Sequence, residues 1–105
     1  MYEDFIAAIR ERKIVIITFY AQDEGRNKTR KCIPFDYGPS RKKGLDERPD
    51  LYHFYNLDSP KGSHNLSIQP EQLESLTITD ESFDPAEYVN WEPNWYIERD
   101  WGEYS

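Results

Sequence analysis

The sequence has a single cysteine and no long hydrophobic run, and each absence excludes a class of protein. Cys32 is the only cysteine among 105 residues, so no internal disulfide can form, and we expect a reducing, cytoplasmic location. A membrane-spanning helix needs about 20 mostly apolar residues. No segment approaches that length, and the mean hydropathy is −0.92. The composition therefore predicts a cytoplasmic protein that does not cross a membrane.

Catalytic and metal-binding motifs are also missing. The sequence contains no recognisable nucleophile elbow, phosphate loop, paired-carboxylate motif or Ser-His-Asp order. His53 and His64 lie on different predicted strands without metal-ligand spacing. We expect both to be ordinary strand residues, and Cys32 to be a buried apolar residue. The sequence thus predicts a non-enzymatic protein with no catalytic residue, metal site or cofactor.

Charge is distributed very unevenly along the chain. Residues 80–105 hold eight carboxylates and one base, Arg99, and so account for the whole net charge of −7. The same segment contains all three tryptophans and four other aromatic residues: Trp91, Trp95, Trp101, Phe83, Tyr88, Tyr96 and Tyr104. Acidic disordered segments are usually poor in large aromatic residues. This acidic segment is therefore expected to pack, either on its own chain or on a partner.

Hydrophobic spacing predicts one helix followed by about five strands. Tyr2, Phe5, Ile6 and Ile9 share one face of a helix over residues 2–12. Segments rich in β-branched and aromatic residues predict strands at 14–21, 29–37, 51–57, 64–68 and 73–79. Pro34 indicates an edge, a bulge or a bend. We expect a mainly β (α+β) fold, with a five-stranded barrel domain over residues 1–83 and an aromatic, acidic extension over 84–105.

Several segments resemble, in order, those of the WYL family. Residues 51–58, with the sequence LYHFYNLD, are similar to its central strand, although Leu51 and His53 replace the tryptophan and leucine. Residues 8–20, 30–35, 64–68, 73–76 and 80–84 resemble the family's other elements, so that the likeness covers residues 5–88. The resemblance implies a small SH3/Sm-like barrel, here without the helix-turn-helix of many bacterial regulators. It also implies a negatively charged ligand, such as a nucleotide or a nucleic acid.

Basic residues around the second strand form the candidate anion site. Arginine and lysine bind phosphate, and tyrosine rings stack on bases. The candidate ligand-binding residues are Arg30, Lys31, Arg41, Lys42, Lys43, Tyr52, Tyr55 and His64. The alternative is that these charged residues lie in a solvent-exposed loop and bind no ligand. On the first interpretation, the chain is a non-catalytic regulatory module that senses a nucleotide or nucleic acid.

The acidic extension allows three interpretations. It packs on the barrel as a structural clasp, it covers the basic loop in place of a phosphate ligand, or it binds a protein partner. Tryptophan and tyrosine are common at the centres of protein interfaces. The candidate partner-binding residues are Trp91, Trp95, Tyr96 and Trp101. The alternative function is therefore a protein-interaction module, either a homodimer or an accessory subunit.

Overall fold

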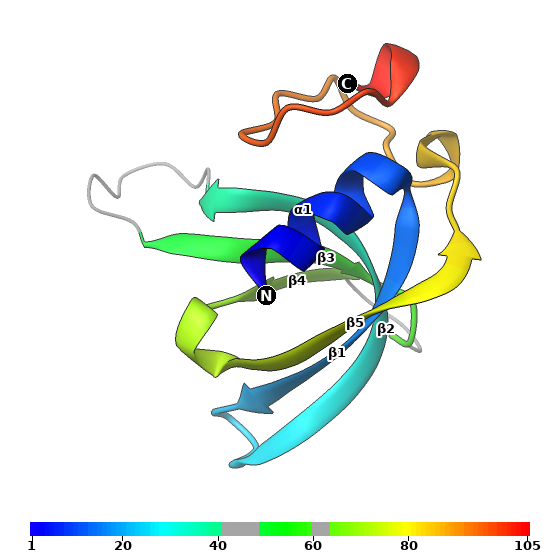
Figure 1. The fold of residues 1–105 in the computed structure, drawn as a ribbon. Coiled ribbons are helices and arrows are strands. Elements are labelled where there is room, and N and C mark those ends of the chain that lie inside the picture. Colours follow the sequence, from blue (N-terminus) through cyan, green and yellow to red (C-terminus); the bar gives the residue numbers. More distant parts are fainter. Residues whose placement is uncertain (41–48, 60–63) are drawn as a thin grey trace.

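The computed structural model describes residues 1–40, 49–59 and 64–105, which contain one α-helix and five strands (Figure 1). These elements are α1 (Tyr2–Glu11), β1 (Lys13–Ala21), β2 (Arg26–Pro39), β3 (Asp50–Asn56), β4 (Asn65–Ile68) and β5 (Leu73–Ser82). Three short 3-10 helices are also present: η1 (Pro70–Gln72) between β4 and β5, and η2 (Pro85–Glu87) and η3 (Gly102–Tyr104) after β5. No helix in these ranges is long and apolar enough to cross a membrane.

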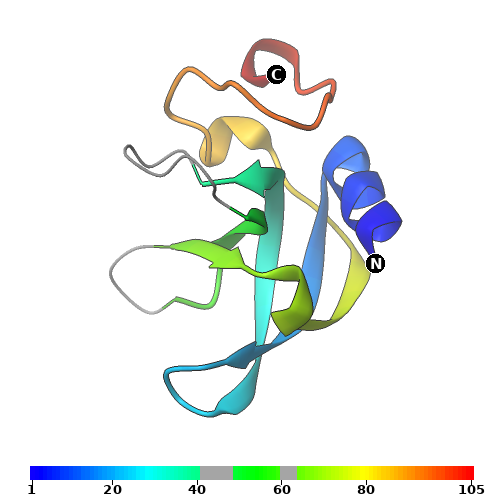
Figure 2. The same ribbon diagram turned by 90° about the vertical axis from the view of Figure 1, so that its left-hand side faces the viewer.

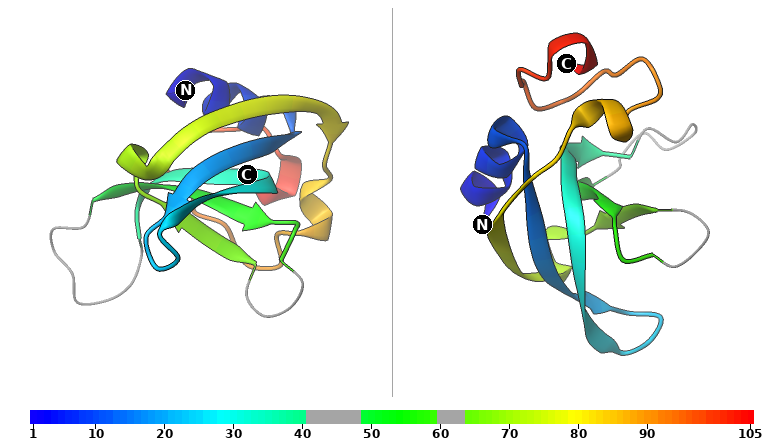
Figure 3. Two further views of the ribbon diagram at one scale, coloured as in Figure 1. Left: turned by 90° about the horizontal axis from the view of Figure 1, so that it is seen from below. Right: turned by 90° about the vertical axis from the view of Figure 1, so that its right-hand side faces the viewer.

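The strands form one antiparallel sheet in the order β4-β3-β2-β1-β5. The chain meanders from β1 to β4, and η1 then returns it so that β5 pairs with the free side of β1, as at Ile17 and Leu76. The sheet curves round a common interior (Figure 3, left). Its described strands do not close, so β4 and β5 are the two edges. The mainly β prediction is thus confirmed, whereas a closed barrel is not observed.

The second strand is longer than the sequence pattern predicts. Arg26 and Asn27 already pair with Ala21 and Tyr20, because the hairpin turn is completed by Gly25 at a positive φ of 64°. The strand therefore begins at Arg26, ahead of its predicted start at residue 29. Pro34 lies inside β2, next to a shift in register between Pro34 and Asp36. Of the three alternatives for this proline, the structure shows the bulge.

Helix α1 covers the interior of the curved sheet. Phe5, Ala8 and Ile9 are fully buried. The Phe5 ring makes edge contacts with Tyr52 and Phe54 of β3, with ring centroids 4.9 and 5.4 Å apart. The helix ends at Arg12, which adopts the left-handed conformation that terminates many helices. The predicted apolar face of the helix is thus the face that contacts the sheet.

The acidic extension passes over one end of the sheet and beside α1 (Figures 1 and 2). Its residues Val89, Ile97 and Trp101 belong to the same buried core as α1 and the strands, as does Phe83 just before it. The Trp101 indole N–H donates a 2.8 Å hydrogen bond to the carbonyl of Ile9. The extension is therefore packed on the body of its own chain.

Candidate functional site

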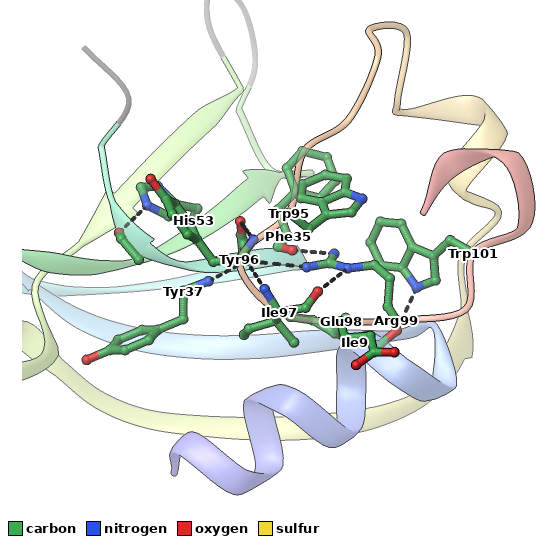
Figure 4. Close-up of polar contacts among 12 residues, drawn as sticks. Ile9, Phe35, Tyr37, His53, Trp95, Tyr96, Ile97, Glu98, Arg99 and Trp101 are labelled. Carbon is green, nitrogen blue, oxygen red and sulfur yellow. Dashed lines mark hydrogen bonds and ion pairs between the residues drawn. The ribbon is translucent and has the colours of Figure 1, made fainter. Parts of the chain in front are cut away.

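Asp36 joins the extension to the sheet. This residue follows the bulge in β2 and is 6% exposed. One carboxylate oxygen accepts hydrogen bonds from the backbone N–H groups of Tyr37 and Ile97, both at 3.0 Å. The other oxygen accepts from the N–H of Tyr96 at 2.9 Å (Figure 4). A single buried carboxylate thus fixes the position of residues 96 and 97 over the sheet.

Arg99 is the second anchor, and it lies between two tryptophan rings. The guanidinium carbon is 4.1 Å from the Trp95 ring centroid and 4.4 Å from that of Trp101 (Figure 4). The guanidinium donates to the carbonyls of Phe35 and Ile97 and pairs with Asp36 at 3.4 Å. Burial lowers the pKa of Arg99 to about 10, and the Asp36 carboxylate opposes this shift. Two predicted partner-binding tryptophans therefore hold an arginine of their own chain.

A groove of about 720 Å³ lies between the extension and the adjoining parts of β2, β3 and β4. Its aromatic lining comprises Phe35, Trp91, Trp95 and Tyr96. Trp91 makes edge contacts with Phe35 and Trp95, with ring centroids 5.7 and 5.9 Å apart, yet it stays 46% exposed. Tyr96 is 45% exposed. Two of the four predicted partner-binding residues thus present large aromatic surface to this groove, which we call the aromatic groove.

Gly38 allows Tyr96 to lie close to the sheet. A Cβ at this position would overlap the Tyr96 ring, so only glycine fits beneath it. The carbonyl of Gly38 also accepts a 2.8 Å hydrogen bond from His53 Nε2 (Figure 4). Gly38 therefore positions both an aromatic and a polar member of the aromatic groove.

The polar part of the groove is centred on a cross-strand pair, His53 of β3 and Ser67 of β4. His53 Nδ1 lies 2.9 Å from Ser67 Oγ. Because the Gly38 carbonyl can only accept, Nε2 must carry a proton, and in the single-proton tautomer this leaves Nδ1 to accept from the Ser67 hydroxyl. The remaining polar lining residues are Asp36, Ser40, Asn65, Glu92 and Asn94. The sequence pattern missed this pair, although the predicted hairpin would place these two residues near each other.

The described members of the predicted anion site are engaged in contacts within the chain. Lys31 pairs with Glu81 at 2.5 Å, and an Arg30 guanidinium N–H donates to the carbonyl of Thr29. Tyr52 is 6% exposed and contacts Phe5 in the core, so its ring offers no surface for base stacking. Arg41, Lys42 and Lys43 lie outside the described residues.

Tyr55 and His64 stack on each other instead of forming an open platform. Their rings are nearly parallel, with centroids 4.8 Å apart, and Tyr88 of the extension contacts the Tyr55 ring edge at 5.1 Å. His64 Nδ1 lies 2.8 Å from the carbonyl oxygen of Asn56. Both side chains are thus occupied by contacts within the chain.

A second hollow of about 610 Å³ lies between the β1–β2 hairpin and β4. Lys28 and Arg30 line it, but so do Asp23 and Asp58. Lys28 also forms an ion pair with Glu24. Because acids balance the bases here, this hollow is a poor site for a phosphate.

Cys32 is fully buried in the core. Burial, with a smaller effect from Asp58, raises the pKa of its thiol to about 12. A thiol held protonated in this way is a poor nucleophile and a poor metal ligand. Within residues 1–40, 49–59 and 64–105, no group of three histidine, cysteine or acidic side chains is arranged to hold a metal ion.

Comparison with known proteins adds no assignment. No protein-family model matches this sequence, and searches of curated proteins and of solved structures found no significant match.

Proposed function

We propose that this chain is a non-catalytic protein-interaction module that binds a basic, extended segment of a partner in the aromatic groove. The observation that carries the proposal is the exposure of Trp91 and Tyr96, at 46% and 45%, beside a hollow of about 720 Å³. The neighbouring Trp101 is buried and Trp95 is partly buried. Exposed aromatic side chains held rigidly by their neighbours are typical anchors of protein interfaces.

Charge favours a basic partner. None of the described lining residues of the groove is lysine or arginine, whereas Glu92 supplies an exposed carboxylate. The whole chain carries a net charge of −7. Such a surface attracts cationic segments and repels phosphates. A second copy of the chain would carry the same negative charge, so the charge argument favours a different protein over a homodimer.

The strand at the edge of the groove favours an extended segment. β4 is an edge strand, and its residues Asn65, Leu66 and Ser67 line the groove. Edge strands commonly bind an extended peptide alongside them, with side chains of the peptide entering adjacent pockets. The same arrangement would place the peptide near Trp91.

We also propose that the fold is an SH3-like barrel related to WYL domains. A helix followed by five antiparallel strands, with β5 returning to β1, supports this proposal. A nucleotide or nucleic-acid ligand and a cytoplasmic regulatory role stay predictions. They receive less support than a basic partner, because Lys31 is paired with Glu81 and Tyr52 is buried.

Calorimetric titration with a short peptide that alternates basic residues with serine tests the proposal. We expect binding at low salt that weakens as salt is added, because the attraction is electrostatic. Trp91→Ala should reduce affinity about ten-fold or more, as truncation of an aromatic anchor does. Tyr20→Ala is the matched control, since Tyr20 is 41% exposed on β1 and does not line the groove.

Three results would contradict the proposal. These are no binding of the basic peptide at low salt, equal losses in the two variants, or equal binding of a peptide with glutamate at every basic position. A single-stranded oligonucleotide serves as the competing ligand. Its binding in place of the peptide would favour the nucleic-acid prediction.

A further inference from the structure

We propose that the cationic group bound in the aromatic groove is the guanidinium of an arginine side chain. This inference rests on the proposed function, because it specifies which basic residue of the partner the groove selects. The direction of the hydrogen bonds in the groove, its exposed aromatic ring and a guanidinium that the chain already binds all favour arginine.

First, the Ser67 hydroxyl is the donor in its hydrogen bond with His53. In the tautomer that the Gly38 carbonyl selects, His53 donates to that carbonyl through Nε2 and accepts through Nδ1 from the Ser67 hydroxyl. The only proton of that hydroxyl is therefore used within the pair. Ser67, which is exposed, presents only lone pairs to the groove. It thus accepts a hydrogen bond from a bound ligand and donates none.

The second step is the acceptor chemistry of Glu92. A carboxylate only accepts hydrogen bonds, and Glu92 lines the same groove as Ser67. A ligand that meets both residues must supply several donors. Arginine carries five N–H donors in one plane and stays charged at all ordinary pH values. Lysine also donates, but its compact ammonium is strongly hydrated and does not stack flat on a ring.

The third step is the exposed ring of Trp91. Edge contacts with Phe35 and Trp95 fix this ring, and the residue is still 46% exposed. Tryptophan is the aromatic side chain that attracts cations most strongly, and guanidinium groups are found over its face more often than ammonium groups. A fixed indole thus adds a preference for arginine to the general preference for positive charge.

The fourth step is that the chain already binds one guanidinium with the same chemistry. Arg99 lies 4.1 and 4.4 Å from the ring centroids of Trp95 and Trp101, and it donates to two carbonyls and the Asp36 carboxylate. Trp95 lines the aromatic groove as well. The solvent-facing groove therefore offers a ligand an indole ring and oxygen acceptors, which is the combination that binds the buried Arg99.

Three peptides that differ at one position test this inference. A serine-rich sequence with one lysine on each side carries arginine, lysine or citrulline at its centre, and each peptide is titrated calorimetrically. Citrulline is the matched control, because it keeps the shape of arginine without the charge. We expect the arginine peptide to bind about five-fold or more tightly than either of the others.

Two variants of Ser67 test whether its hydroxyl oxygen causes the preference for arginine over lysine. Ser67→Ala removes the oxygen and should reduce the arginine-to-lysine ratio, whereas Ser67→Thr retains the hydroxyl and should keep it. Far-ultraviolet circular dichroism of both variants reports that the strands are intact. A preference that Ser67→Ala leaves unchanged would overturn the role given to this residue.

The outcomes separate this inference from the proposed function. If the arginine and lysine peptides bind equally well and Trp91→Ala abolishes the binding of both, the arginine preference is overturned. The proposed interaction module is then still supported. No binding of any peptide overturns both. Free arginine amide that binds as tightly as the arginine peptide would contradict a partner segment as the source of the guanidinium.

Discussion

At the scale of single residues, Asp36 links two parts of the chain that are far apart in sequence. Its carboxylate accepts the backbone N–H groups of Tyr96 and Ile97, which lie 60 and 61 residues further along the chain. It also pairs with Arg99, whose side chain is fully buried. Buried N–H groups and charges are costly when their partner is removed. The attachment of the extension therefore depends strongly on this one carboxylate.

We expect Asp36→Ala to lower the free energy of unfolding by about 3–5 kcal/mol, the usual cost of leaving a buried charge unpaired. Urea denaturation followed by tryptophan fluorescence measures the change. Asp23→Ala is the control, because Asp23 is exposed in the β1–β2 turn, and its effect should be within about 0.5 kcal/mol. Similar losses in the two variants would show that Asp36 has no special role.

At the scale of secondary structure, α1 and the extension satisfy each other's polar groups. The last carbonyls of a helix have no partner within the helix. The Ile9 carbonyl accepts from the Trp101 indole, while the Arg10 and Arg12 side chains donate to the carbonyls of Glu98 and Asp100 at 3.3 and 2.8 Å. The extension thus completes the C-terminal end of α1 as well as the core.

Hydrogen exchange on two tryptophan variants tests this arrangement. Trp101→Ala removes a 2%-exposed ring and its hydrogen bond to Ile9, so the amides of residues 89–105 should exchange faster. Amides of β1 and β2 should stay protected. Trp91→Ala, in which the ring lost is half exposed, should leave exchange of the extension nearly unchanged. Equal effects of the two variants would contradict the docking described here.

The secondary structure could largely be predicted from the sequence, because it depends on local spacing. The apolar face of residues 2–12 and the run of β-branched and aromatic residues in β1 are strong local signals. Pro34 indicated an edge, a bulge or a bend, and the structure has the bulge. The extra residues at the start of β2 could not be predicted, since Arg26, Asn27 and Lys28 are polar and pair only because Gly25 closes a tight turn.

The candidate site could be predicted only in part, because its contacts are distant in sequence. The aromatic residues of the extension were identified from composition, and Trp91, Trp95 and Tyr96 do line the groove. Nothing local distinguishes Asp36 from the other acids, and its partner Arg99 lies 63 residues away. Tyr52 has the sequence context of a surface strand residue, but the position of α1 places it in the core.

At the scale of the whole molecule, charge and packing have separate roles. Residues 80–105 account for the entire net charge of −7, yet backbone hydrogen bonds, aromatic contacts and the Arg99–Asp36 pair hold this acidic segment to the body. Most of its carboxylates, such as Glu92, Glu98 and Asp100, are exposed. The negative charge is therefore available to attract a basic partner while the aromatic residues maintain the fold.

The most direct test of the central claim is a backbone and indole amide NMR titration with the arginine-containing peptide. Binding in the aromatic groove predicts shifts that are largest at the Trp91 indole N–H and at the amides of Ser67 and Glu92. The β1–β2 hairpin, which carries Lys28 and Arg30, should be unaffected. Shifts confined to that hairpin, or no shifts at saturating peptide, would contradict binding of the peptide in the aromatic groove.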